Sequence, residues 1–349
     1  MKNSLRIGGA FVGLIIGGGF ASGQEILQYF IAYGWYGIFG AILASLIFAF
    51  LGMNIATLGY KLKTSSHKDV VLYIAGPTLG SVIDCLITVF AFCFTVAMFA
   101  GAASAFEVLF GMNGFVGSLF MMILTIFTLM LNVQKIINLL ALAIPYLMAI
   151  ILIIVIASIF TMDGSFVEHE QIARTLEVER HWMLAALLYV SYNMAVGLPM
   201  LAVMGSTVKS KKEAGFGGII GGLLLGGLIL LVYMALLAKM NVILGKPMPT
   251  LVLAMDIHPV IGLLMAITLI LMIYSTAVGV LYSFVVRFAS PSSKMYKPFV
   301  IFSAFVAFFA SFIGFTTIVG TVYAIMGYLG FFIIAIILWT WLKRRAGVA

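Results

Sequence analysis

Long apolar segments recur along the whole chain, separated only by short clusters of charged, glycine or proline residues. A transmembrane helix needs about 20 apolar residues, so a span with its loop uses about 30–35. The 349 residues therefore predict an all-α integral membrane protein with about ten spans. The segments lie near 5–33, 36–61, 80–109, 115–131, 135–160, 182–206, 214–239, 259–287, 297–313 and 317–342.

Composition excludes several classes of protein. Only 9% of the residues are charged and 64% are hydrophobic, whereas a soluble domain carries roughly 25% charged residues. A soluble enzyme, a nucleic-acid-binding protein and a disordered chain are excluded. The sequence carries no Ser/His/Asp set, HExxH, P-loop or CxxC motif, so we expect neither an enzyme nor a cofactor. Cys85 and Cys93 are eight residues apart on one helix, too far for a disulfide.

The distribution of basic residues predicts the orientation. Most of the 19 Lys and Arg residues fall on the same side as the N-terminus when the segments are threaded alternately through a bilayer. Because basic loops stay in the cytoplasm, both termini are expected there. The acidic segment 161–181 is then extracellular. The short Leu251–Ile257 stretch is expected to form a surface helix.

Two segments carry matching interruptions. The first contains Gly17–Gly23 and the sixth contains Ser191–Pro199. The offset from Gly18 to Asn193 is 193 − 18 = 175 residues, half the chain. Five spans per half make the second half enter from the opposite face. We therefore predict a five-plus-five inverted repeat, over 1–160 and 182–349, with helices 1 and 6 broken at mid-depth.

A broken helix inside a membrane has a functional meaning. Lipid offers no hydrogen-bond partners, so unwound backbone survives only where protein or a water-filled cavity satisfies it. Freed amides favour anions and freed carbonyls favour cations. Interrupted spans at matching places in two halves indicate a transporter site. The alternative is close helix packing on glycine, which is the interpretation for Gly9, Gly13 and the glycines at 217, 218, 221, 222, 226 and 227.

The segment Gly17–Ile26, GGGFASGQEI, resembles the first-helix signature of the YkvI-like family of bacterial amino-acid permeases. Ser191–Pro199 is a second, weaker match. This family is placed in the amino acid–polyamine–organocation superfamily. The resemblance implies the LeuT-type fold and a bacterial inner-membrane location. It also implies a central site between helices 1 and 6, lined by helices 3 and 8.

On that pattern, amides near Phe20–Gly23 would hold a substrate carboxylate, and carbonyls near Tyr192–Ala195 would accept from an amine. Ser275 and Thr276 match the helix-8 hydroxyls of sodium-coupled relatives, facing carbonyls near Gly17 and Gly18. Their order is reversed here, which leaves Na⁺ and H⁺ both open as coupling ions. The candidate substrate-binding residues are Gly18, Gly19, Phe20, Ala21, Ser22, Gly23, Gln24, Glu25, Tyr192, Asn193, Ala195, Phe94 and Met98, with Phe99 as a further wall.

Ionisable residues inside a span are costly and indicate function. Glu25 lies just outward of the first break, where it would bind a cationic group or a coupling ion, or carry a proton. The alternative is a hydrogen-bond network with Gln24. Asp84 is expected to pair with Lys135 or Arg287, and Glu107 to reach the outer surface.

These features favour an ion-coupled secondary transporter, a symporter for an amino acid or similar small amine. The site would lie at mid-depth and open alternately to each side. The partners are then a small-molecule substrate and the lipid bilayer. A passive channel and a small-molecule-sensing membrane receptor are the alternatives.

Overall fold

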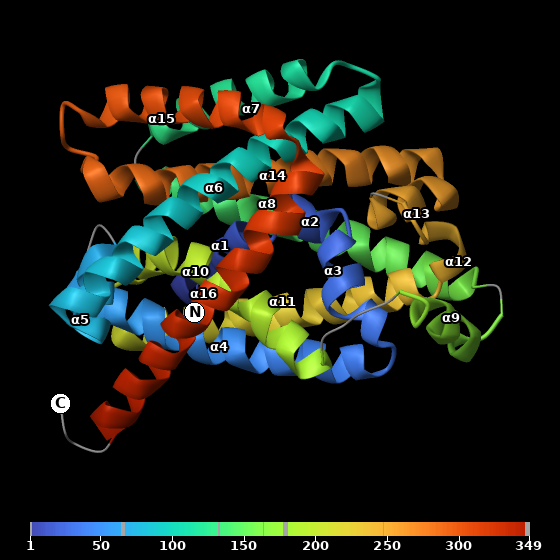
Figure 1. Cartoon of the computed structure of the whole chain (residues 1–349), viewed down its shortest axis with the longest axis horizontal. Helices are drawn as coiled ribbons and strands as arrows, with labels where there is room; N and C mark the ends of the chain where they lie inside the picture. The colour runs from blue at the N-terminus through green and yellow to red at the C-terminus, as the bar shows by residue number, and fades with distance from the viewer. Residues whose placement is uncertain are drawn as a thin grey trace.

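The computed structural model describes residues 2–63, 67–131, 133–162, 164–176, 181–246 and 248–345. Every regular element in these ranges is helical (Figure 1). The elements are α1 (Lys2–Ile15), α2 (Gly18–Ala21), α3 (Gln24–Tyr29), η1 (Ile31–Tyr33), α4 (Tyr36–Leu62), α5 (His67–Ala75), α6 (Pro77–Phe110), α7 (Gly114–Leu129), α8 (Val133–Phe160), α9 (Phe166–Ala173), α10 (Trp182–Ser206), α11 (Lys211–Leu237), α12 (Met240–Ile243), α13 (Pro249–Ile257), α14 (Pro259–Phe288), α15 (Tyr296–Ala310), η2 (Ser311–Ile313) and α16 (Phe315–Arg345).

Among the described residues, six helices are long and apolar enough to cross a membrane. Shorter apolar helices are α7, the Pro145–Phe160 part of α8 and the Ile325–Trp339 part of α16. The all-helical membrane class is confirmed, and the count of ten spans stays a prediction. The six candidate spans are α4, Pro77–Glu107 of α6, α10, α11, α14 and Tyr296–Ile313.

The first apolar segment is interrupted as predicted. Helix α1 ends at Ile15, and Gly17 is extended, with φ −98° and ψ −162°. One turn of helix follows as α2, and then Gly23 takes a left-handed conformation with φ 86° before α3 begins. Glycine adopts positive φ without steric cost, which explains why the residue at this turn is a glycine.

The predicted break in the sixth segment is wrong. Helix α10 runs unbroken from Trp182 to Ser206 with Pro199 inside it. Proline is tolerated within a transmembrane helix where neighbouring helices support the backbone, and residues 185–186 and 188–205 of α10 are buried. Gly197 serves packing, because a Cβ there would meet the Ile15 side chain at 2.6 Å.

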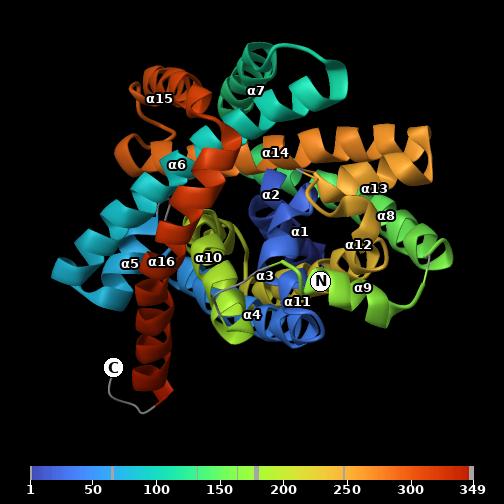
Figure 2. The same cartoon turned by 45° about the vertical axis from the view of Figure 1, so that its right-hand side comes forward.

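Elements half a chain apart lie against each other. Helix α4 packs on α11, α6 on α14, and α7 on α15. Figures 1 and 2 both show α7 and α15 side by side, apart from α4 and α11 on the opposite side of the molecule. The inverted symmetry of the halves 1–160 and 182–349 stays a prediction, for which this pairing is the expected arrangement.

Glycine makes the α4–α11 contact close. A Cβ on Gly218 would meet the backbone of Gly52, and one on Gly222 would meet the backbone of Ala49. These α11 positions are four residues apart and share one helix face. Small residues at this spacing allow two membrane helices to approach backbone to backbone. The packing interpretation of the helix-7 glycines agrees with the structure except at Gly227, where a Cβ would meet no atom within 4 Å.

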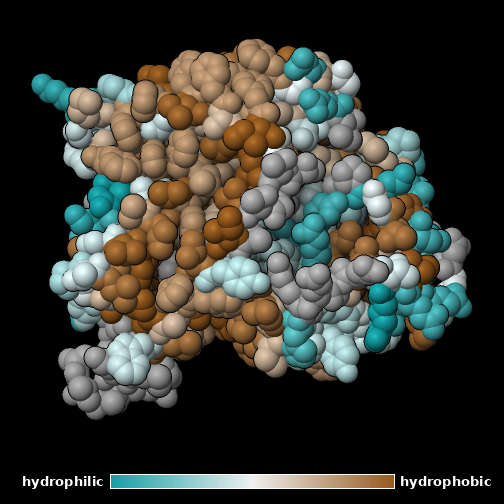
Figure 3. Space-filling model, viewed as in Figure 1, coloured by the Kyte–Doolittle hydropathy of each residue, from teal (hydrophilic) through white to brown (hydrophobic). Residues whose placement is uncertain are grey.

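The surface separates by polarity. Apolar residues cover much of the face in Figure 3, and hydrophilic residues gather toward the side where α9 and α12 lie in Figure 1. The expected surface helix is present as α13, although Thr250, Leu251 and Leu253 in it are buried. Segment 161–181 contains the short helix α9, capped by Ser165.

Candidate functional site

The C-terminal end of α1 meets two hydroxyls of α14. The Ser275 Oγ lies 2.9 Å from the Gly13 carbonyl oxygen and 3.0 Å from that of Met272. The Thr276 Oγ1 lies 3.0 Å from the Leu14 carbonyl oxygen and 3.2 Å from that of Ile16. The last carbonyls of a helix have no intrahelical donor, so the interruption after Ile15 supplies the carbonyls of Gly13, Leu14 and Ile16, whereas the Met272 carbonyl belongs to α14 itself.

This cluster holds more oxygen lone pairs than protons. Each hydroxyl carries one proton, so two protons face the three carbonyl oxygens of Gly13, Leu14 and Ile16, around the buried Ser275 and Thr276. Hard cations are held by such neutral carbonyl and hydroxyl oxygens. The donor set therefore fits a small monovalent cation such as Na⁺. The described residues contain no group of three or more His, Cys, Asp and Glu side chains that would suit a transition metal.

The carbonyls around the hydroxyls differ from those expected. Gly17 and Gly18 were the expected partners, whereas the hydroxyls meet Gly13, Leu14 and Ile16. A Cβ on Gly17 would lie 3.1 Å from the Met98 sulfur and 3.5 Å from the Thr276 methyl group. Gly18 packs against Ile273. The helix ends before these glycines, so its free carbonyls belong to the preceding turn.

The outer side of the break is tied to α13. The Thr250 hydroxyl donates to the Ala21 carbonyl, and the Thr250 amide donates to the Ser22 carbonyl at 3.0 Å. The Gln24 side chain donates to the Lys246 carbonyl at 2.9 Å. Gly23 lies against Thr250 as well. Gln24 thus fastens the outer loop instead of facing the site.

Glu25 is buried beside Gly19. Only 5% of the residue is exposed, and a Cβ on Gly19 would collide with the Glu25 carboxyl. The carboxyl therefore folds back over the one-turn helix α2, toward the interruption. The hydroxyls of Tyr189 and Tyr192 face this carboxyl, yet neither hydroxyl nor the Glu25 Oε2 reaches hydrogen-bonding geometry with a protein atom.

Aromatic rings surround this carboxyl. The Tyr29 ring centroid lies 5.6 Å from that of Tyr189 and 5.7 Å from that of Tyr192. The Tyr323 ring lies 5.3 Å from Tyr192 and stacks on Phe94 at 4.4 Å. These rings come from α3, α6, α10 and α16, so the cluster joins both halves of the chain. We call Tyr29, Phe94, Tyr189, Tyr192 and Tyr323 the aromatic cluster.

The predicted residues of α10 divide into two kinds. Tyr192 belongs to the aromatic cluster, whereas the Asn193 amide donates to its own helix at the Tyr189 carbonyl, 2.9 Å away. Because α10 is continuous, the carbonyls near Tyr192–Ala195 are not freed by a break. Only Pro199, which has no N–H, deprives the Ala195 carbonyl of its helical donor.

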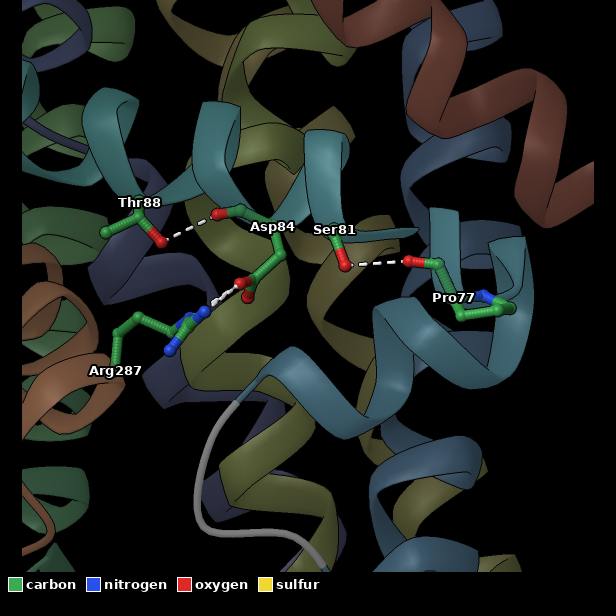
Figure 4. Close-up of polar contacts among 5 residues, drawn as sticks. All are labelled: Pro77, Ser81, Asp84, Thr88 and Arg287. Atoms are coloured by element: carbon green, nitrogen blue, oxygen red, sulfur yellow. Dashed lines mark hydrogen bonds and ion pairs between the residues drawn. The ribbon is translucent and has the colours of Figure 1, made fainter. Parts of the chain in front are cut away.

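The remaining charged residues lie outside this centre. Asp84 pairs with Arg287, as one of the two alternatives predicted, with the carboxyl Oδ2 2.6 Å from Nε and 2.5 Å from an Nη (Figure 4). The pair joins α6 to α14. Glu107 is exposed and accepts from the Gly114 amide at 3.1 Å. Lys135 is exposed.

Sequence reasoning missed part of the aromatic cluster. Tyr189 lies three residues before Tyr192, so the two share a helix face, and this spacing was a usable signal. Tyr323 carries no such signal, since only the packing of α16 against α10 brings it near. Phe20 and Phe99 are fully buried, with no ring contact to this cluster among the described aromatic pairs.

No family model matches the chain. The uncharacterized membrane protein YkvI of Bacillus subtilis is 27% identical over 62% of this chain and 61% of its own length. The uncharacterized protein YyaD of the same organism is 26% identical over 62% of this chain and 60% of its own length. The matched regions thus span about three fifths of these curated relatives.

Solved structures show the same fold. MhsT, in complex with L-phenylalanine, gives a TM-score of 0.71 at 16% identity, over 95% of this chain and 88% of its own. A Na⁺-coupled sialic acid symporter gives 0.66 at 15% identity, over 94% and 75%. The nucleobase-cation-symport-1 family transporter Mhp1 gives 0.64 at 16% identity, over 93% and 77%. The chain is a homologue of the membrane protein YkvI and has the fold of the LeuT-like transporters.

Proposed function

We propose that this chain is a secondary active transporter that moves an amino acid or similar small amine across the bacterial inner membrane, coupled to Na⁺ or H⁺. The observation that carries the proposal is the interrupted first helix, whose free carbonyls meet the hydroxyls of Ser275 and Thr276 while Glu25 lies buried on its outer side. The transporters that share this fold support the class.

The substrate would bind between the interrupted first helix and α10. The candidate residues are those from Gly18 to Gly23 and Glu25, with Tyr192, Phe94 and Met98 as walls. Of the other predicted residues, Gln24 is bound to the Lys246 carbonyl, and Asn193 and Ala195 lie on the unbroken α10. Rocking of one helical bundle around this point would expose it alternately to the two sides. The termini would lie in the cytoplasm. Because α10 is continuous, the backbone groups that line the proposed site come from the interrupted first helix, and α10 contributes only side chains.

The coupling ion would bind at the inner side of the interruption. A Na⁺ held by Ser275, Thr276 and the carbonyls of Gly13 and Ile16 would join α14 to the end of α1. Its binding would fix the geometry of α2, on which the substrate site depends. Glu25 is the candidate group for a proton-coupled mechanism, since its carboxyl is buried within the same interruption.

The first measurement is a thermal-unfolding screen of the purified protein against amino acids and small amines, in sodium and in potassium salts. A bound ligand raises the unfolding temperature by mass action. Each ligand found this way is then tested for uptake into proteoliposomes under an inward Na⁺ gradient, an inward H⁺ gradient or none. We expect saturable accumulation that needs one of the gradients.

Gly19→Leu is the matched variant, because a side chain there displaces Glu25. Gly227→Leu is the control, since no atom lies within 4 Å of its Cβ position. We expect Gly19→Leu to lose uptake and Gly227→Leu to retain it. Single-channel current without accumulation would replace the transporter by a channel, and binding without any flux would indicate a receptor. Equal uptake by both variants would show that the site is misplaced.

A further inference from the structure

Four buried polar atoms lack a hydrogen-bond partner on the outer side of the interruption. They are the Glu25 Oε2 and the hydroxyls of Tyr189, Tyr192 and Tyr323. Native proteins leave few buried polar groups unpaired, and each such group calls for an explanation. Here α3, α10 and α16, which are distant in sequence, each contribute to the group. Unpaired polar groups that converge from three helices indicate a site at which a polar ligand could bind.

The four atoms belong to one cluster. The Glu25 carboxyl acts electrostatically on each of the three tyrosines. The Tyr192 ring centroid lies 5.6 Å from that of Tyr189 and 5.3 Å from that of Tyr323. All three tyrosines are at most 2% exposed. The occupant would therefore be enclosed by one carboxylate, three phenol oxygens and aromatic faces.

The charge of Glu25 decides the chemistry of the occupant. A buried carboxylate without a cation costs several kcal/mol. At the buried Asp84 this cost is offset by an ion pair with the Arg287 guanidinium. Among the ion pairs of the described residues, none includes Glu25. Water would satisfy the phenol hydroxyls but would leave the negative charge without a partner, so a cationic occupant fits better.

The backbone beside Glu25 offers little to a second, anionic group. The amides of Ala21, Ser22 and Gly23 already donate to the carbonyls of Gly17, Gly18 and Phe20, at 2.9–3.0 Å. Helix α2 has only four residues, too few for a helix-dipole site of any strength. This differs from the expectation that amides near Phe20–Gly23 bind a carboxylate.

We propose that the substrate is a small primary-amine cation without a carboxylate, whose ammonium group binds Glu25 and the hydroxyls of the aromatic cluster. An ammonium carries three N–H donors, and the cluster presents the Glu25 oxygen and three phenol oxygens to receive them. Aromatic faces attract a cation in addition. The Phe94 side of the cluster would receive the apolar part of the substrate. This inference rests on the proposed transport function and narrows it.

The test compares three probes of the same shape on the purified full chain. 2-Phenylethylamine has the ammonium, phenylalanine adds a carboxylate, and 2-phenylethanol lacks the charge. Binding is measured by calorimetry and thermal unfolding. We expect 2-phenylethylamine to bind at least about tenfold more tightly than either other probe, because a hydrogen bond to a charged group contributes more than one between neutral groups.

Variants test the named groups. We expect Glu25→Gln to weaken 2-phenylethylamine binding about 10- to 100-fold, and Tyr323→Phe about three- to tenfold, since the latter removes one neutral hydrogen bond and keeps the ring. Glu170→Gln is the control, because that carboxyl on α9 is also buried but pairs with Arg174, the residue that follows the helix. Its affinity should stay within about twofold. If Glu25→Gln fails to fold, the comparison of the three probes and the affinity of Tyr323→Phe still test whether this cluster binds the ammonium group.

Two results would overturn the inference. Phenylalanine binding as tightly as 2-phenylethylamine would show that a carboxylate has its own site. Unchanged 2-phenylethylamine affinity in Tyr323→Phe and Glu25→Gln would show that this cluster holds no ammonium, for example because a proton alone neutralises Glu25. Failure of the transport proposal gives a different pattern: 2-phenylethylamine would bind to the cluster, with no gradient-dependent uptake.

Discussion

The Asp84–Arg287 pair allows an asymmetric prediction about stability. The Asp84 side chain is 3% exposed, whereas the Arg287 side chain is 26% exposed. Arg287→Met would leave the carboxylate buried without its guanidinium, at a cost of about 3–5 kcal/mol in the free energy of unfolding. Asp84→Asn would leave an arginine that still reaches water and can still donate to the new amide oxygen. Its cost should be only about 1–3 kcal/mol.

The double variant separates the pair from its members. Asp84→Asn with Arg287→Met removes both charges, so it should be more stable than Arg287→Met alone. A coupling energy of about 1–3 kcal/mol is expected for residues in such contact. The assay is equilibrium unfolding in detergent micelles, with Asp256→Asn as control. Asp256 is exposed, and its substitution should change stability by no more than about 0.5 kcal/mol.

Two outcomes would refute this reasoning. If Asp84→Asn destabilised the protein as much as Arg287→Met, the difference in exposure would not govern the cost. If the double variant lost the sum of the single losses, the two side chains would act independently. Either result would remove the electrostatic link that we assign between α6 and α14.

Two further substitutions test the interruption itself. Gly23→Ala places a Cβ on a residue with φ 86° and only 2.9 Å from the Thr250 methyl carbon. The free energy of unfolding should therefore fall by about 1–2 kcal/mol or more. The control Gly227→Ala, in open space on α11, should be neutral or stabilising, and equal losses in both variants would show that Gly23 is not required for the turn. Thr276→Val should abolish the increase in unfolding temperature that Na⁺ produces. Ser283→Ala is the control and should keep this increase, because the Ser283 hydroxyl donates only to the Gly279 carbonyl of its own helix. A sodium response retained by Thr276→Val would place the ion elsewhere.

The sequence predicted the class of fold and one of the two interruptions. Apolar length and charge scarcity are properties of composition, so they can be read without knowing any contact. The first interruption was also predictable, because Gly17–Gly19 and Gly23 provide several flexible positions within one span. The break expected at Ser191–Pro199 was wrong, since one glycine and one proline are compatible with a helix that neighbours support on all sides.

What the tertiary structure decided is which groups come together. Pattern alone identified Glu25 as a costly buried charge and Ser275 and Thr276 as hydroxyls of interest. It could not determine that these hydroxyls meet the carbonyls of Gly13 and Ile16, or that Tyr323 packs on Tyr192. The physical reason is that periodicity fixes which face of a helix is apolar, whereas the partner on that face depends on how helices distant in sequence pack.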